Sequence, residues 1–144
     1  MKTDKGFSLL ELLIVVAIIL IIATIAIPSL LRSRQAANES SAVANIRTFN
    51  TAQVSYASAG GASSYGTIGE LTAAGLIDSR FSGMFSGFTF GLDLSADRLQ
   101  YTVYATAAAV NTGRYDYYST PDLVIRYSTD SSRAPSGLNG EPVR

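Results

Sequence analysis

Residues 6–28 read GFSLLELLIVVAIILIIATIAIP, and this stretch decides the organisation of the chain. Between residues 12 and 27, Thr24 is the single polar side chain. A helix over residues 7–31 reaches roughly 35–40 Å at about 1.5 Å per residue, which is enough to cross the hydrocarbon core of a bilayer. The stretch is therefore predicted to be a transmembrane stem. We expect it to be retained, because no A-x-A-like cleavage site follows the apolar run.

One carboxylate, Glu11, lies a single turn inside this apolar helix, after a short leader that carries Lys2 and Lys5. An ionised group placed in hydrocarbon costs free energy unless a partner neutralises it. The position of Glu11 therefore indicates a role in assembly. The alternative is a first-turn glutamate that complements the helix dipole near the lipid headgroups.

The composition excludes much chemistry. The chain has 144 residues and a formal net charge of zero, and it contains neither cysteine nor histidine. These absences exclude a thiolate nucleophile, a Ser-His-Asp triad, a zinc site with nitrogen or sulfur ligands, and a disulfide staple. The charge balance does not indicate nucleic-acid binding. We expect no catalysis and no cofactor.

The segment after the stem is predicted to continue as an amphipathic helix over residues 32–58, ending at Gly60-Gly61. One face of this helix is apolar and should support the rest of the chain. Its members are Val43, Ile46, Phe49, Ala52 and Tyr56, whereas Arg34, Glu39, Asn45 and Arg47 are assigned to the polar side.

Residues 59–84 are predicted to form a connection with one short helix. Thr67 and Glu70 have the spacing of a capping box, and Gly75 is a plausible stop, so we expect a helix over about residues 68–74. Its glycine- and serine-rich lead-in is expected to be a solvent-facing loop.

Residues 85–128 alternate between apolar and polar side chains as strands do. Four strands are expected, with short connections that favour an antiparallel meander. They contain Phe88–Leu94, Leu99–Ala105, Tyr115–Tyr118 and Leu123–Tyr127, with turns at Ser95–Arg98 and Asn111–Gly113. The tail, residues 129–144, is expected to be irregular.

Three other features of the sequence are given structural interpretations. The scattered aspartates do not match a calcium loop and are read as turn and strand-end residues. Asn38-Glu39-Ser40 matches a glycosylation sequon, which its expected helical position weakens. Tyr115, Tyr117 and Tyr118 are interpreted as residues that pack in the sheet or contact another subunit. The five aspartates are Asp93, Asp97, Asp116, Asp122 and Asp130.

The junction of Gly6 with FSLLELLIVV, residues 7–16, resembles the prepilin leader junction of type IV pilins and of the related type II secretion pseudopilins. The resemblance implies that a prepilin peptidase cleaves after Gly6 and N-methylates Phe7. It also implies that Glu11 pairs with the amine of a neighbouring subunit and fixes the register between subunits. The resemblance is close over residues 1–35 and weak beyond about residue 60.

Pro28 has a counterpart in the pilins that this chain resembles. It lacks an N–H and crowds the carbonyl group of Thr24, so the helix loses a hydrogen bond there and bends or opens locally. The resemblance implies melting of the helix between roughly Ala23 and Pro28 when subunits pack into a filament. The alternative is a proline that ends the helix at the membrane boundary.

The resemblance implies an α+β chain with the type IV pilin fold, in which a long N-terminal helix packs on a four-stranded antiparallel sheet. The leader is then residues 1–6, the stem 7–31, the second half of the helix 32–58, the connection 59–84, and the sheet 85–128. Well-known pilins close a C-terminal loop with a cysteine pair, and this chain has no cysteine.

The expected function is that of a structural subunit, the major pilin, of a bacterial type IV pilus. The precursor would lie in the inner membrane and the assembled form at the cell surface. Its expected partners are copies of itself in a helical filament, the prepilin peptidase, the inner-membrane assembly platform, and membrane lipid before assembly. The alternatives are a pseudopilin of a type II secretion system and a membrane-anchored enzyme or binding protein with an uncleaved stem.

Overall fold

The computed structural model describes residues 6–60, 64–128 and 140–143. The chain divides into two compact units, Met1–Arg34 and Gln35–Arg144. Helix α1 (Leu9–Ala59) begins in the first unit and ends in the second. The predicted long helix is confirmed, with both of its ends within two residues of their expected positions.

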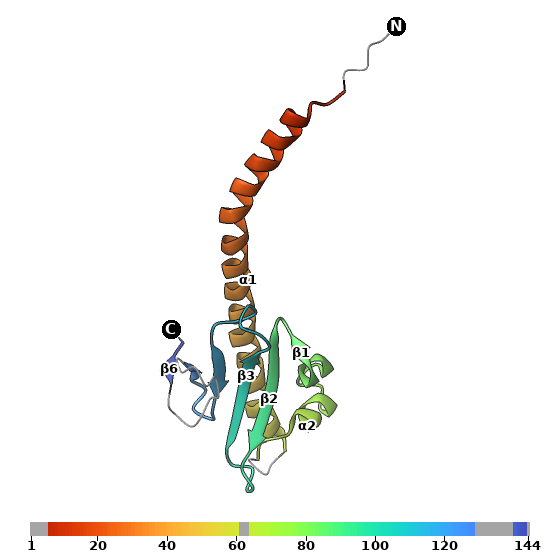
Figure 1. Ribbon diagram of the computed structural model, residues 1–144. Helices are drawn as coiled ribbons and strands as arrows, with labels where there is room; N and C mark the ends of the chain where they lie inside the picture. The colour runs from red at the N-terminus through yellow and green to blue at the C-terminus, as the bar shows by residue number, and fades with distance from the viewer. Residues whose placement is uncertain (1–5, 61–63, 129–139, 144) are drawn as a thin grey trace. The chain divides into compact units, whose positions relative to one another are not determined.

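The second unit, which we call the head, contains the C-terminal part of α1, two short helices and a sheet. The sheet lies against α1, with α2 close to β1 (Figure 1). The short helices are α2 (Ile68–Ala73) and the 3-10 helix η1 (Ser79–Ser82). The strands are β1 (Met84–Phe85), β2 (Phe88–Leu94), β3 (Tyr101–Ala107), β4 (Asp116–Ser119), β5 (Ile125–Ser128) and β6 (Glu141–Pro142).

Helix α2 begins and ends as its sequence predicts. The Thr67 hydroxyl accepts a 3.2 Å hydrogen bond from the Glu70 N–H, and the Glu70 carboxylate accepts a 2.7 Å bond from the Thr67 N–H. At the other end Gly75 has φ +70°, a conformation that glycine adopts without steric cost. The N–H of Leu76 then donates to the Leu71 carbonyl at 2.9 Å, which completes a Schellman motif.

The strands form one antiparallel sheet in the order β1-β2-β3-β4-β5-β6, so the predicted meander is confirmed. The predicted number of four strands is wrong, since the sheet has six within the described residues. The two additional strands, β1 and β6, have two residues each and lie at the edges. A two-residue strand is too short to show the alternation by which strands are recognised in a sequence.

Strand β6 also corrects the expectation for the C-terminal tail. Residues 129–144 were expected to be irregular, but Glu141 and Pro142 pair with β5. The intervening residues 129–139 lie outside the described part of the chain, and so does Asp130.

The core of the head forms where α1 meets β2 and β3. Phe49 on α1 packs edge-on against Phe81 of η1, with ring centroids 4.9 Å apart, and Phe90 of β2 lies 5.5 Å from Phe81. Alternate residues of β3, namely Tyr101, Val103, Ala105 and Ala107, are buried beneath α1, as their spacing predicts. The apolar periodicity of the sequence therefore locates this core.

The buried face of α1 contains more polar side chains than its sequence indicates. Asn50 and Gln53 are buried, and so are Glu39 and Asn45, which the sequence pattern assigned to the polar side. That assignment is wrong for Glu39 and Asn45. The reason for Glu39 is a specific partner in the sheet region, described below, which makes burial of its carboxylate tolerable.

Candidate functional site

The N-terminal junction lies in the first unit. Gly6, Phe7 and Ser8 precede α1, and the side chain of Phe7 is 80% exposed. The leader residues 1–5 lie outside the described residues. The predicted cleavage point between Gly6 and Phe7 therefore falls in a non-helical, exposed segment immediately before the first helical turn.

Glu11 folds back onto the start of its own helix. Its Oε2 atom accepts a 2.9 Å hydrogen bond from the Ser8 N–H, and the Ser8 hydroxyl accepts a longer 3.3 Å bond from the Leu10 N–H. The Glu11 bond is one half of a capping box, while the Ser8 hydroxyl bonds the amide of the second helical residue instead of the third. In the single chain the carboxylate thus complements the first-turn amides, which was the alternative reading of the sequence. This contact leaves the Oε1 atom of Glu11 for other donors, since none among the described residues bonds to it.

The stem is apolar around its whole circumference. Every leucine, isoleucine and valine from Leu9 to Leu31 is exposed, over a range from 44% at Leu31 to 81% at Leu9. Within the described residues, α1 is the one helix that is long and apolar enough to cross a membrane, judged by length and composition alone. A surface of this kind needs lipid or other apolar helices around it.

Pro28 lies inside α1, which continues beyond it without interruption. The alternative in which Pro28 ends the helix is therefore wrong. The carbonyl of Thr24 faces a residue without an N–H, so the helical ladder lacks one hydrogen bond there. The Thr24 hydroxyl donates to the Ile21 carbonyl at 2.7 Å, a side-chain bond that also perturbs the local backbone pattern. Thr24 and Pro28 therefore mark a local gap in the helical ladder of the stem.

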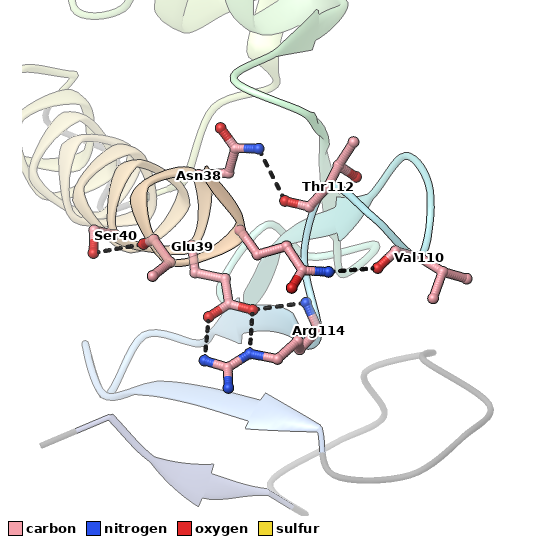
Figure 2. Close-up of polar contacts among 8 residues, drawn as sticks. Asn38, Glu39, Ser40, Val110, Thr112 and Arg114 are labelled. Atoms are coloured by element: carbon pink, nitrogen blue, oxygen red, sulfur yellow. Dashed lines mark hydrogen bonds and ion pairs between the residues drawn. The ribbon is translucent and has the colours of Figure 1, made fainter. Parts of the chain in front are cut away.

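The first turns of α1 within the head are hydrogen-bonded to the loop between β3 and β4. The Gln35 amide donates to the Val110 carbonyl at 2.9 Å, and the Asn38 amide donates to the Thr112 carbonyl at 3.0 Å. Figure 2 shows Asn38 directed toward Thr112. Because the Asn38 nitrogen already donates to a backbone carbonyl, the match of residues 38–40 to a glycosylation sequon has no structural support.

Glu39 and Arg114 form the strongest polar contact of this region. Oε1 of Glu39 accepts a 2.6 Å hydrogen bond from the Arg114 N–H and a 3.3 Å bond from its Nε, while Oε2 lies 3.1 Å from Nη2 (Figure 2). The Glu39 residue is 6% exposed. The hydrogen bonds with Glu39 raise the pKa of the Arg114 guanidinium. Sequence reasoning missed this pair, because its members are 75 positions apart.

Two further buried contacts hold α1 to the rest of the head. The Gln53 amide bonds both to the carbonyl and to the N–H of Gly66, at 2.7 and 2.9 Å. Asn50 donates to the Ser119 hydroxyl and accepts from the Tyr101 hydroxyl, each at 2.9 Å. Both sets satisfy polar groups that would otherwise be costly to bury.

The remaining chemical candidates behave as structural residues. Asp97 and Asp122 accept backbone hydrogen bonds within turns, and buried Asp116 accepts a 2.8 Å bond from the Ala107 N–H. The described residues contain no group of three or more acidic side chains that could hold a metal ion. Of the tyrosines, Tyr115 and Tyr117 pack on Tyr127, with ring centroids 5.0 and 6.5 Å apart. Burial raises the pKa of Tyr117 to about 12.

The comparisons with known proteins each cover part of the chain. Residues 1–27 match the prokaryotic N-terminal methylation motif. The chain is 46% identical over 53 residues to the type IV major pilin protein PilA of Myxococcus xanthus, a match that covers 37% of this chain and 24% of that protein. It is 56% identical over 39 residues to the type IV wide pilus major component PilA4 of Thermus thermophilus, covering 27% and 30% of the two chains.

Each of these matches therefore spans less than a third of the relative's length. No solved structure matches the chain. The methylation motif lies on the segment that carries Gly6, Phe7 and Glu11, and the long helix followed by an antiparallel sheet agrees with the fold that the sequence resemblance implies. The chain is therefore similar to type IV pilins in its methylation motif and over the stretches that match its two major-pilin relatives.

Proposed function

We propose that this chain is the major structural subunit of a bacterial type IV pilus. The observation that carries the proposal is the exposed apolar stem, most of which lies within the methylation motif at residues 1–27. Such a stem can be anchored in lipid as a precursor and can then pack against the stems of other copies. Both named relatives are major components of type IV pili, which supports this role over an enzymatic one.

In the proposed pathway the precursor resides in the inner membrane through its stem. A prepilin peptidase cleaves after Gly6 and methylates the new amine of Phe7. The assembly platform then draws the subunit from the lipid into a helical polymer of copies of this chain. Because lipid tails are as apolar as leucine, the gain on assembly comes from close packing between stems and from polar contacts, and not from removal of water.

The proposed polar contact joins Glu11 of one copy to the Phe7 amine of the next. Opposite charges attract strongly in a low-dielectric medium, and pairing compensates part of the desolvation that each charge suffers there. In the single chain, Glu11 uses Oε2 for the Ser8 N–H at 2.9 Å. The carboxylate has two oxygens, so it can keep this bond and accept from an amine through the other.

The proposal is tested by imaging cells that express the chain and by mass spectrometry of the subunit in purified fibres. We expect long surface filaments whose subunit begins at N-methylated Phe7. Short periplasmic fibres would favour the pseudopilin. Recovery of a mature protein that still begins at Met1, without filaments, would favour a membrane-anchored protein with an uncleaved stem and would refute the proposal.

A further inference from the structure

The loop between β4 and β5 holds a leucine in an unusual backbone conformation. Leu123 has φ 63°, in the left-handed region that glycine adopts freely and that other residues seldom occupy. Its side chain is 50% exposed. A glycine would satisfy the backbone here at lower cost, so the fold of the head gives no reason for a large apolar side chain at this position.

The surrounding loop enforces this conformation. The Leu123 N–H donates to the Thr120 carbonyl at 2.9 Å, and Oδ1 of Asp122 accepts from the Thr120 hydroxyl at 2.8 Å and from the Val124 N–H at 3.1 Å. The Arg126 Nη2 donates to the other oxygen of Asp122, Oδ2, at 2.6 Å. The loop therefore presents Leu123 in one defined position instead of leaving it to move with a flexible turn.

Leu123 shares a shallow hollow with residues of α1. The hollow has a volume of about 540 Å³, and Val54, which is 45% exposed, and Arg47 lie on its α1 side. The Arg47 guanidinium has no acidic partner among residues 6–60, 64–128 and 140–143. Leu123, Val54 and Arg47 together form what we call the Leu123 patch, with two apolar side chains beside one unpaired cation.

We infer that the Leu123 patch docks the head of a second copy of this chain, an inference that rests on the proposed filament function. A free partner protein fits the patch poorly, because stable interfaces bury on the order of 1,000 Å² or more and two aliphatic side chains supply a small part of that. In a polymer the stems already hold the heads together at high effective concentration. A small contact then adds to a binding event that is largely intramolecular.

Charge complementarity also favours a second copy. Arg47 needs an acidic group from its partner. The described part of the head offers four exposed carboxylates outside its ion pairs, namely Asp78, Asp93, Asp97 and Glu141. Asp93 lies on β2, away from the β4–β5 loop along the sheet order. A patch that meets a different surface on the next copy makes a heterologous contact, which propagates into a helical polymer.

The decisive variant is Leu123→Gly in the full-length chain. Glycine adopts positive φ without steric cost, so the midpoint of thermal unfolding of the head should stay the same or rise. The filament should nevertheless lose subunits about tenfold faster, the order expected when one buried leucine is removed from a contact. Subunit release from sheared filaments is followed by sedimentation. All eight tyrosines lie at or after Tyr56, so near-ultraviolet circular dichroism of the chain in detergent reports on the head.

Leu99→Ala is the matched control, because Leu99 is 52% exposed on the same head but outside the patch. It should leave subunit release unchanged. Filaments of Leu123→Gly that release subunits at the rate of the unaltered chain would overturn the inference while leaving the proposed function intact. If the unaltered chain forms no filaments, the proposed function fails and the inference fails with it.

A second experiment measures directly whether the Leu123 patch is buried in the filament. Because the chain has no cysteine, Leu123→Cys provides one thiol for labelling with a maleimide. We expect rapid labelling of the detergent-solubilised monomer and strong protection in intact filaments. Equal labelling rates in the two states would overturn the inference.

Discussion

Glu39 on α1 and Arg114 at the start of the β4 region are joined by three hydrogen bonds, the shortest of which runs from the Arg114 N–H to Oε1 of Glu39 at 2.6 Å. The carboxylate is buried and the guanidinium is largely exposed, with side chains 8% and 58% accessible. The contact is therefore more than a surface ion pair, because a backbone donor depends on it.

Glu39→Ala should destabilise the head, because the Arg114 N–H loses its acceptor. Loss of a partner for a buried polar group costs about 1–3 kcal/mol, and the partly buried Arg114 N–H should fall in the lower part of that range. Glu39→Gln keeps an acceptor oxygen and should cost less. Urea denaturation of the full chain in detergent, followed by tyrosine circular dichroism, measures both variants. Equal stability of Glu39→Ala and the unaltered chain would show that water replaces the carboxylate at no cost.

Gln53→Ala should also lower the stability of the head, by a similar amount. The Gln53 amide is fully buried and bonds both polar groups of Gly66, so truncation leaves two backbone groups without partners. The expected loss is about 1–3 kcal/mol, measured by the same denaturation. Thr51→Ala, a change at an exposed position of α1 two residues away, serves as the control and should be nearly neutral.

Glu11→Ala should leave processing possible and impair assembly. The proposed cleavage after Gly6 acts on the non-helical segment before α1, whereas the proposed pairing with the Phe7 amine needs the carboxylate. Mass spectrometry of the membrane fraction measures processing, and the amount of sheared filament measures assembly. Glu11→Gln is the matched variant, because it can still accept from the Ser8 N–H but carries no charge. Normal filament yield from Glu11→Gln would argue against charge pairing.

Proline at position 28 should permit local melting when subunits pack. We expect a density map of the filament to show non-helical backbone between about residues 23 and 28, although α1 is continuous in the single chain. Pro28→Ala restores the missing donor and should keep that segment helical. Continuous helical hydrogen bonding across residues 20–30 in filaments of the unaltered chain would contradict the melting hypothesis.

Alkaline pH should unfold the head through its buried tyrosines. Burial raises the pKa of Tyr117 from 10.0 to about 12 and also raises that of Tyr101. The folded state therefore holds these protons more tightly than the unfolded state, so the stabilisation is complete below about pH 10 and is lost as pH rises toward 12.

Tyr117→Phe tests this pH dependence, because it removes one of the groups that must ionise. The midpoint of alkaline unfolding should move to higher pH, whereas stability at neutral pH should change much less. Circular dichroism and tyrosinate absorbance, recorded on the same samples, separate unfolding from ionisation. An unchanged alkaline midpoint in Tyr117→Phe would show that other groups control the transition.

The sequence by itself determined the features that arise from neighbours along the chain. The apolar composition of residues 9–31 predicts the stem, the spacing of Thr67 and Glu70 predicts the start of α2, and alternation predicts β2 and β3. These features follow from helix and strand periodicity, which operate over a few residues.

Tertiary structure alone decided which polar groups are buried and where the sheet ends. Glu39 is buried because Arg114, 75 positions away, supplies its donors, and β6 exists because β5 offers an edge with which to pair. Polar burial and edge pairing are favourable only when the partner is present, and chain folding, not local pattern, brings these partners together.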